Sequence, residues 1–443
     1  MRACISGIGL ITPIACGVPD TRSALKAGKR GLSPITLFAV SPKERLPVGQ
    51  IAGDLTDPEV PRTHQLALMA AREAMARSEE SPDAIVVGTT TGGMLKTEGH
   101  FKRGETGNAH FRYHAPCSVG EYVAQRLGCS GPVITVSTAC SSGALAIKVA
   151  VEMLRTRQAK RVLVGGADAL CRLTYYGFRS LQLIDPEGAR PLDRDRRGMS
   201  LSEGAGMLLL EAKAQMSDRE ACDVMGVGLS CDAYHPSAPD PEGRGALHAM
   251  EAALKDAGMP PSAIDYVNLH GTGTLDNDHA EARALRVLFG EKVPPVSSVK
   301  GAMGHSLAAS GAIEAGIAAM SISGRLIPGT TGCERPDPRR GLDPVLQPVE
   351  ADMETVLSNA FGFGGNNASV VIGRGDTRRF GKRSEKVPYL TVVGSACVTG
   401  AGDTEASRRA VWEKGGCKGV LPMDGLPLTL QSKLVRRWRR LTR

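Results

Sequence analysis

The chain has 443 residues, of which 42% are hydrophobic and 4% aromatic, and its formal net charge at pH 7 is +8. This length and composition indicate a globular protein with a large buried core, and the 53 glycines fit an α/β protein with many tight turns. The eleven cysteines are odd in number and include no C-x-x-C pair, which argues against a disulfide framework and against a metal site built on such pairs.

The N-terminal sequence MRACISGIGLITP predicts the first strand of the fold. It has neither the basic-then-apolar layout nor the cleavage site of a signal peptide, so we expect a cytoplasmic protein. The nearest approach to a membrane span is residues 306–324, but this stretch is rich in small residues and contains Glu314. We interpret it as a buried helix and expect no stable membrane insertion.

Apolar runs typical of buried strands alternate with segments of helical periodicity along the first 375 residues. This alternation predicts an α/β fold with parallel sheets. After Lys213 a second alternation of strands and helices begins, which divides the region into two α/β halves, 1–213 and 214–375. We expect the two halves to pack into one body. The strands are predicted at 84–87, 133–136, 162–164, 207–210, 267–269 and 370–372, and the clearest helices at 143–154 and 244–257.

The end of the chain has a different character. Residues 376–388 are polar and charged, which predicts a surface linker. Fifteen Lys/Arg and five Asp/Glu follow Asp376, so most of the net positive charge lies there and the residues before it are nearly neutral. Residues 389–421 repeat the pattern of residues 2–34, for example Gly394 for Gly7 and Gly415 for Gly28. We interpret 389–443 as a partial, non-catalytic second copy of the N-terminus, and favour a truncated or split tandem module over a retained surface appendage.

Cys140 is the first candidate for a reactive group. In VITVSTACSSGALAIKVAVEML, a β-rich run ends at a turn that holds Cys140, and a helical pattern begins near Ser141. At a helix N-terminus the dipole and the unpaired N–H groups are expected to lower the pKa of the thiol below about 8.5. This arrangement is typical of a nucleophile elbow, although a buried core cysteine would give the same local pattern.

Three later segments present polar or aromatic side chains in glycine-bearing loops next to strands, where ligands gather in α/β folds. Two of them have a purely structural interpretation as well: turn capping for the threonines and an ordinary hairpin for the last segment. The carboxylate of Glu314, on a helix of small residues, needs a partner. The candidates are His270, Thr272 and Thr274 in HGTGT, Lys300 and His305 in KGAMGH, Glu314 beyond them, and Phe361 and Phe363 in AFGFGG.

In this order, the motifs TACSSG, HGTGT, K-x-x-x-G-H and GFGG resemble those of the β-ketoacyl synthases of the thiolase superfamily, in their elongating Cys-His-His form. The resemblance covers residues 1 to about 375. It implies a thiolase-like α/β fold, in which two similar halves form a layered αβαβα body. Leu192 stands where phenylalanine is frequent and Asn366 where threonine is common, but neither departure removes a catalytic group.

The resemblance implies an acyltransferase, a 3-oxoacyl-[acyl-carrier-protein] synthase of fatty-acid or polyketide-type biosynthesis. An acyl group would be held on Cys140, a malonyl thioester would lose carbon dioxide, and the carbanion would attack the acyl group. His270 and His305 would stabilise the enolate, with Lys300 and Glu314 in support. The backbone N–H groups of Cys140 and Phe363 would form the oxyanion hole, Phe363 would also act as a gate, and Thr272 and Thr274 would bind pantetheine.

The same resemblance implies no metal and no organic cofactor, because phosphopantetheine arrives on the carrier protein. The expected partners are an acyl carrier protein, malonyl and acyl thioesters, and a second subunit in a homodimer or a synthase heterodimer, with no nucleic acid. A basic patch for the acidic carrier is expected near the pantetheine entrance, and residues 110–113 or 194–197 could contribute to it.

Three other functions compete with this one. A non-condensing partner, like the chain-length factors, usually lacks the cysteine, whereas Cys140 is present. A thiolase needs a second catalytic cysteine near the C-terminus, and Cys397 lies outside the matching region. A Cys-His thioester hydrolase would not explain two histidines together with Lys300.

Overall fold

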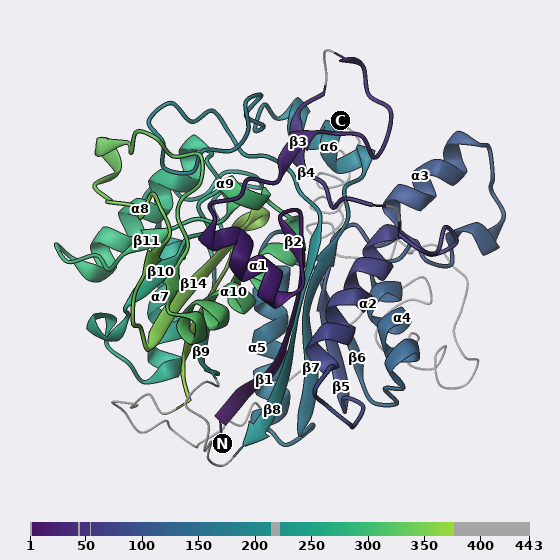
Figure 1. Cartoon of the computed structure of the whole chain (residues 1–443), viewed down its shortest axis with the longest axis horizontal. Coiled ribbons are helices and arrows are strands. Elements are labelled where there is room, and N and C mark those ends of the chain that lie inside the picture. The colour runs from purple at the N-terminus through teal and green to yellow at the C-terminus, as the bar shows by residue number, and fades with distance from the viewer. Residues whose placement is uncertain (1, 43–44, 54, 214–221, 376–443) are drawn as a thin grey trace, which may run out of the picture. The chain divides into compact units, whose positions relative to one another are not determined.

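A computed structural model describes residues 2–42, 45–53, 55–213 and 222–375 (Figure 1). The predicted linker at 376–388 and the predicted partial copy at 389–443 lie outside these residues. The predicted boundary between the halves falls beside residues 214–221, which also lie outside them, and it stays a prediction.

The first half contains five strands of one sheet, in the order β6-β5-β7-β8-β1. Strand β5 pairs in parallel with β6 and β7, whereas β8 pairs antiparallel with β7 and with β1. The bounds are β1 Arg2–Thr12, β5 Ala84–Gly88, β6 Val133–Val136, β7 Arg161–Asp168 and β8 Gly204–Lys213.

The second half repeats this topology in the order β11-β10-β14-β15-β9. Strand β10 pairs in parallel with β11 and β14, and β15 pairs antiparallel with β14 and β9. The predicted similarity of the two halves is therefore confirmed at the level of strand order and direction. The bounds are β9 Cys222–Cys231, β10 Tyr266–Asn268, β11 Val296–Ser297, β14 Thr355–Gly362 and β15 Asn366–Arg374.

The expectation of wholly parallel sheets is wrong, because each half mixes parallel and antiparallel pairs. Strands β14 and β15 are joined directly by the short turn η6 (Phe363–Gly365), and such a connection can only join antiparallel strands. Antiparallel pairing of β1 with β9, from Ala3↔Val224 to Ile5↔Cys222, then joins the two halves edge to edge into one continuous sheet.

Helices cover the outer face of each half of this sheet, and two more helices lie between the two halves (Figure 1). Helices α2 and α4 pack on the first half, and α7 and α8 on the second, each burying an apolar cluster. Helices α5 and α10 lie in the middle and pack against strands of both halves. This gives the five predicted layers. The bounds are α2 Arg62–Met75, α4 Cys117–Leu127, α5 Ser142–Arg155, α7 Arg244–Ala257, α8 Leu275–Phe289 and α10 Ser310–Gly324.

The two central helices approach each other through small residues. A Cβ added to Gly143 would lie 2.7 Å from the carbonyl oxygen of Ala308 and 2.9 Å from the nitrogen of Ala312. A Cβ on Gly311 would lie 3.0 Å from the nitrogen of Ala144. Glycine is therefore required at position 143 for the observed spacing of α5 and α10, and a side chain at position 311 would be accommodated only if its neighbours moved slightly.

The stretch Leu307–Gly324 is long and apolar enough to cross a membrane by length and composition, but 89% of it is buried inside the protein. It includes α10 and forms part of the core, as the sequence predicted. The remaining elements are short: α1 Val18–Lys26, α3 Met94–Lys102, α6 Arg172–Ser180, α9 Lys300–Met303, β2 Ala15–Cys16, β3 Leu32–Pro34, β4 Pro47–Gly49, β12 Leu326–Ile327, β13 Val349–Glu350, η2 Asn108–Phe111, η3 Pro261–Ala263, η4 Leu307–Ala309 and η5 Pro338–Arg340.

Candidate active site

Cys140 lies in the turn between β6 and α5, as the sequence predicted. Ala139 has a φ of 53°, a left-handed conformation that is costly for a residue with a side chain and that turns the chain sharply. Two hydroxyl groups stabilise this turn: Thr138 N–H donates to Ser142 Oγ at 2.9 Å, and Ser141 Oγ donates to the Thr138 carbonyl at 2.8 Å. The cysteine thus sits just before the N-terminus of a central helix.

The thiol is buried. Cys140 is 5% exposed, and the backbone N–H groups of Phe363 and Cys140 both face its sulfur. Burial raises the pKa of the thiol to about 11, although these N–H groups and the charge of Lys300 act to lower it. The expected pKa below about 8.5 is therefore wrong for this closed site, because loss of water outweighs the helix dipole and the donors.

The turn η6 brings Phe363 to the cysteine. A Cβ added to Gly362 would lie 3.1 Å from the nitrogen of Cys140, and Gly364 has a φ of 80°, so both positions favour glycine. The Phe363 ring stacks on Phe178 of α6, with ring centroids 5.3 Å apart.

His270 follows β10, and its backbone is fixed by a buried carboxylate. Glu281 of α8 accepts the N–H groups of His270 at 2.9 Å and Gly271 at 2.8 Å, and also the side-chain amide of Asn359 at 3.1 Å. Gly271 has a φ of 37°, which lets the chain leave the strand end toward Thr272.

Lys300 begins the short helix α9, and His305 lies in the segment that leads from α9 to α10. The Lys300 ammonium forms a buried ion pair with Glu314, and its Nζ lies 3.4 Å from His270 Nδ1. Since an ammonium group only donates, Nδ1 of His270 acts as the acceptor and the ring hydrogen is left on Nε2. The Nδ1 atom of His305 lies 2.8 Å from Ser310 Oγ.

The two imidazole rings meet edge to face, with centroids 5.2 Å apart. Burial lowers the pKa of both histidines well below the ordinary value of 6.5, and the charge of Lys300 lowers both further. Both rings are therefore neutral at pH 7, so each can offer one N–H as a hydrogen-bond donor.

A cavity of about 70 Å³ collects most of the predicted residues. Its polar lining includes Cys140, His270, His305, Thr272 and Thr274, and its apolar lining includes Phe178, Leu183, Met199, Phe361 and Phe363. Lys300 and Glu314 lie behind the histidines and do not line it. Larger hollows of about 1020 and 410 Å³ lie beside α8, and neither is lined by the cysteine or by these histidines.

The two threonines bond to each other as well as lining the cavity. Their Oγ1 atoms are 2.8 Å apart, and the Thr274 N–H donates to Thr272 Oγ1 at 3.2 Å. These contacts agree with the turn-capping interpretation, which does not exclude a role in binding.

Sequence reasoning missed the acidic residues that hold these loops. Asp168, at the end of β7, accepts N–H or O–H groups from Thr89, Thr90 and Thr91 at 2.6 to 2.9 Å, and the N–H of Ala308 at 3.0 Å. The available signals were an aspartate closing an apolar strand in VLVGGADAL and the D-x-x-E spacing after HGTGT, which contains Glu281.

Among the described residues, one group has the composition of a metal site: His100, Glu105 and His110, whose ligand atoms lie within 4.8 Å of one another. The Arg103 guanidinium already occupies it, with Nε 2.8 Å from Glu105 Oε1 and Nη2 3.1 Å from His100 Nδ1. We therefore assign no ion to this group, since a second cation would have to displace the arginine.

Comparison with known proteins gives consistent matches. Residues 2–216 match the family described as Beta-ketoacyl synthase, N-terminal domain, and residues 221–334 match its C-terminal domain. The chain is 34% identical over 405 residues to 3-oxoacyl-[acyl-carrier-protein] synthase 2 of Synechocystis sp., which covers 83% of this chain and 97% of that protein.

Two solved structures have the same fold. The ishigamide ketosynthase/chain length factor matches with a TM-score of 0.79 and 31% identity, covering 84% of this chain and 99% of that one. A type II polyketide synthase acyl-carrier protein in complex with its ketosynthase, AntDE:AntF, matches with a TM-score of 0.75 and 26% identity, covering 85% and 99%. The predicted thiolase-like fold class is confirmed by these matches together with the layers and strand order.

Proposed function

Because this chain belongs to the β-ketoacyl synthase family, we propose that it is a 3-oxoacyl-[acyl-carrier-protein] synthase that works through an acyl group held on Cys140. The observation that carries the proposal is the shared cavity, in which one buried thiol faces two neutral imidazoles. This set of groups suits attack on a thioester followed by stabilisation of an enolate.

In the first half-reaction, the sulfur of Cys140 attacks the carbonyl carbon of an acyl thioester. A new carbon–sulfur bond forms while the bond to the pantetheine sulfur breaks, and the thiol proton leaves with the pantetheine thiol. In this proposal the N–H groups of Cys140 and Phe363, which lie close to the sulfur, donate to the oxyanion. A pKa of about 11 implies that the thiol stays protonated until a substrate enters.

In the second half-reaction, malonyl thioester enters and loses carbon dioxide. The electron pair of the broken carbon–carbon bond becomes an enolate, whose oxygen needs donors. His270 can offer Nε2–H, because Lys300 faces its Nδ1, and His305 can do the same when Ser310 donates to its Nδ1. The enolate carbon then attacks the acyl group, the carbon–sulfur bond to Cys140 breaks, and the thiolate that leaves takes a proton from water to restore the thiol.

We assign supporting roles to the other predicted residues. Lys300 and Glu314 hold the histidine loops through their buried ion pair and do not line the cavity. Thr272 and Thr274 bind the pantetheine amides at the cavity wall. Phe363 acts as a gate, because its stack on Phe178 must open for an acyl chain to pass. The proposed chemistry needs neither a metal nor an organic cofactor.

The proposed partners are an acyl carrier protein and a second synthase subunit. Strand β6 is an edge strand of the described sheet. The surface also exposes Phe101 of α3, Leu173 of α6 and Leu181 just after α6. Such a surface suits a homodimer or a heterodimer, as in the ketosynthase and chain length factor pair. For the carrier, both expected stretches offer exposed cations: Arg194 and Arg197 are each about half exposed, and Arg112 is exposed as well.

The test is intact-mass analysis after incubation with a panel of acyl-carrier thioesters and then with malonyl-carrier. Wild-type protein is expected to gain an acyl group that discharges as a 3-oxoacyl product. Cys140→Ala is expected to gain none, whereas Cys171→Ala, which removes another buried thiol, should behave as wild type. His305→Ala should be acylated but should not decarboxylate malonyl-carrier.

The outcomes separate the competing functions. No adduct with any donor would contradict the proposal and favour a non-condensing partner like a chain-length factor. Release of free acid without malonyl-carrier would indicate a hydrolase. Equal loss of acylation in the Cys140 and His305 variants would refute the proposed division of roles.

A further inference from the structure

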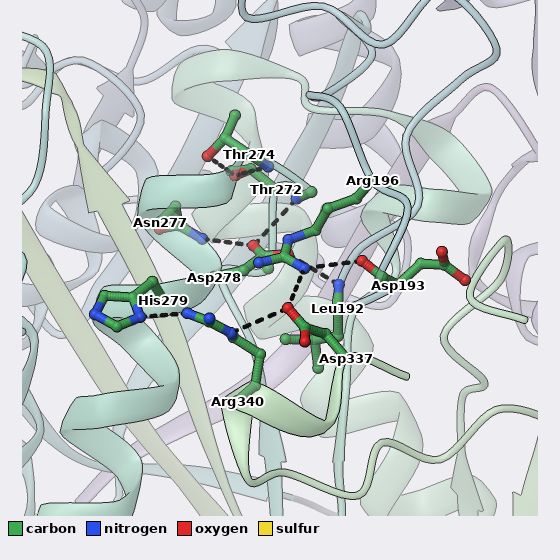
Figure 2. Close-up of polar contacts among 12 residues, drawn as sticks. Leu192, Asp193, Arg196, Thr272, Thr274, Asn277, Asp278, His279, Asp337 and Arg340 are labelled. Carbon is green, nitrogen blue, oxygen red and sulfur yellow. Dashed lines mark hydrogen bonds and ion pairs between the residues drawn. The ribbon is translucent and has the colours of Figure 1, made fainter. Parts of the chain in front are cut away.

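A buried arginine lies beneath the threonine loop (Figure 2). The side chain of Arg196 is 1% exposed, and it lies between two carboxylates that have no exposure at all. Its Nε is 3.2 Å from Asp278 Oδ2, and its Nη1 is 3.0 Å from Asp337 Oδ2. The same Nη1 donates to the carbonyl of Asp193 at 2.8 Å. One guanidinium thus connects three segments that are distant in sequence.

Asp278 connects the arginine to the threonine loop. Its Oδ1 accepts the N–H of Gly273, the residue between Thr272 and Thr274, at 3.2 Å. Its Oδ2 accepts the N–H of Leu192 at 2.9 Å. Asp278 belongs to the first turn of α8, so this carboxylate fixes the loop to the start of that helix.

Leu192 shows that the arrangement holds the backbone under strain. Its φ is 61°, a left-handed conformation that is rare for leucine. Both of its backbone groups are taken: its N–H donates to Asp278, and its carbonyl accepts the N–H of Asp337 at 2.8 Å. Such strain persists only where surrounding contacts enforce it.

Asp337 is fixed from a second side. Arg339 donates to it from Nε at 2.8 Å and from Nη2 at 3.0 Å, and Arg340 Nε lies 3.2 Å from its Oδ2. Arg340 also contacts His279 of α8, as Figure 2 shows. The turn η5 is therefore attached to α8 both through Arg196 and through Arg340.

We propose that Arg196 and Asp337 are positioning residues that hold Thr272 and Thr274 in place for the pantetheine arm of the substrate. This rests on the proposed function, since it assumes that the threonines bind pantetheine. Neither residue lines the cavity that contains Cys140, although Arg196 lines the neighbouring hollow of about 410 Å³. Their connection to the threonine loop runs through Asp278 and Gly273.

An arginine is needed here for geometric reasons. Its planar fork keeps the charge in a fixed position, with Nε 3.2 Å from Asp278 Oδ2 while Nη1 donates to Asp337, whereas the ammonium of lysine is a point charge on a flexible chain. Without the fork, Asp278 would be a buried carboxylate lacking a full counter-charge, and burial already raises its pKa while Arg196 lowers it. A protonated Asp278 accepts fewer hydrogen bonds, so the N–H of Gly273 would lose its partner.

The test compares substrates with and without pantetheine amides. Arg196→Lys is expected to raise the KM for acyl-carrier thioesters roughly tenfold, the loss that one or two hydrogen bonds represent. The rate of Cys140 acylation by a simple S-ethyl thioester, which lacks those amides, should change less than about twofold. Asp337→Asn should give the same pattern, and it serves if Arg196→Lys does not fold.

A double-mutant cycle separates positioning from general stability. In a Thr272→Val/Thr274→Val background, Arg196→Lys should add less than about twofold to KM, because both changes act on the same contact. Arg155→Lys is the matched control, since Arg155 pairs with Asp256 at 3.0 Å at the end of α5 remote from Cys140. It should leave both KM and the acylation rate unchanged. Circular dichroism verifies that each variant is folded at the assay temperature.

Three results would overturn the inference. The first is an unchanged KM for carrier thioesters in both variants. The second is an equally large fall in the rate of acylation by the S-ethyl thioester. The third is full additivity of the KM changes with those of the threonine substitutions. These differ from failure of the proposed function, in which wild-type protein itself forms no acyl adduct with any thioester.

Discussion

Glu281 provides a sharp test of how burial controls this site. The residue is 2% exposed, and burial raises the pKa of its carboxyl from 4.5 to about 7, even though three donors act to lower it. A carboxyl whose pKa is higher in the folded state binds more protons when folded between these two values. Folded stability should therefore fall as pH rises from 4.5 to about 7 and stay constant above that. At 1.36 kcal/mol per pKa unit, the interval corresponds to about 3 kcal/mol.

Glu281→Gln isolates this contribution, because the amide has the shape of a protonated carboxyl and no charge at any pH. The amide also places an NH2 group against one of the N–H donors, at a cost of about 2 kcal/mol that does not depend on pH, so near pH 4.5 the variant should be less stable than wild type by about that amount. The free energy of unfolding of the variant should then gain on that of wild type by about 3 kcal/mol as the pH rises to 8. Activity should change in the opposite direction, because only the carboxylate can accept the N–H groups of both His270 and Gly271.

The assay is urea unfolding of both proteins at pH 5, 6, 7 and 8, with Glu251→Gln on the exposed face of α7 as a control for removal of a charge. The control should differ from wild type by a few tenths of a kcal/mol at every pH. A stability gap for Glu281→Gln that does not vary with pH would refute the reasoning. The reasoning would also be refuted if the variant lost stability relative to wild type as the pH rises, because that would mean that the three donors outweigh burial.

Three further predictions address the thiol and the packing. The rate of Cys140 alkylation by iodoacetamide, followed by peptide mass, should rise about tenfold per pH unit between pH 7 and 10, because the thiolate is the reactive form and its pKa is about 11; a plateau near pH 8 would contradict this. Asp168→Asn should lower the free energy of unfolding by about 2 kcal/mol and reduce condensation, because the new amide would face the N–H of Ala308 or a threonine hydroxyl. A fully active and equally stable variant would show that Asp168 does not hold these loops. Gly7→Ala should destabilise by about 3 kcal/mol in thermal unfolding, since the new methyl would lie 1.9 Å from the Ala74 carbonyl oxygen, and an unchanged Tm would show that α2 can move away.

Much of the fold was predictable because strands and helices here have clear apolar patterns. The segments at 133–136 and 244–257 coincide with β6 and α7. Strand direction was not predictable from the pattern, because a buried antiparallel strand such as β8 has the same continuous apolar sequence as a buried parallel strand. The β1–β9 pairing that joins the halves depends on residues more than two hundred positions apart.

The candidate site divides in the same way. The sequence predicted that Cys140, His270 and His305 would come together, and the structure gathers them around one cavity. It did not predict the state of the thiol, because the extent of burial arises only when η6 closes over the cysteine. Asp168 and Arg196 escaped notice for a similar reason, since their partners lie on segments that only the folded chain brings together.

The close crossing of α5 and α10 limits how this site can diverge in evolution. Cys140 precedes α5 in the first half and His305 precedes α10 in the second, so the two groups occupy equivalent turns of a duplicated topology. The distance between them depends on how near the helix axes lie, which Gly143 and Gly311 keep short. A larger side chain at either glycine would separate the nucleophile from the histidine without touching any reacting atom. A new substrate range is therefore accessible through residues of the surrounding loops, while the two central helices have to stay as they are.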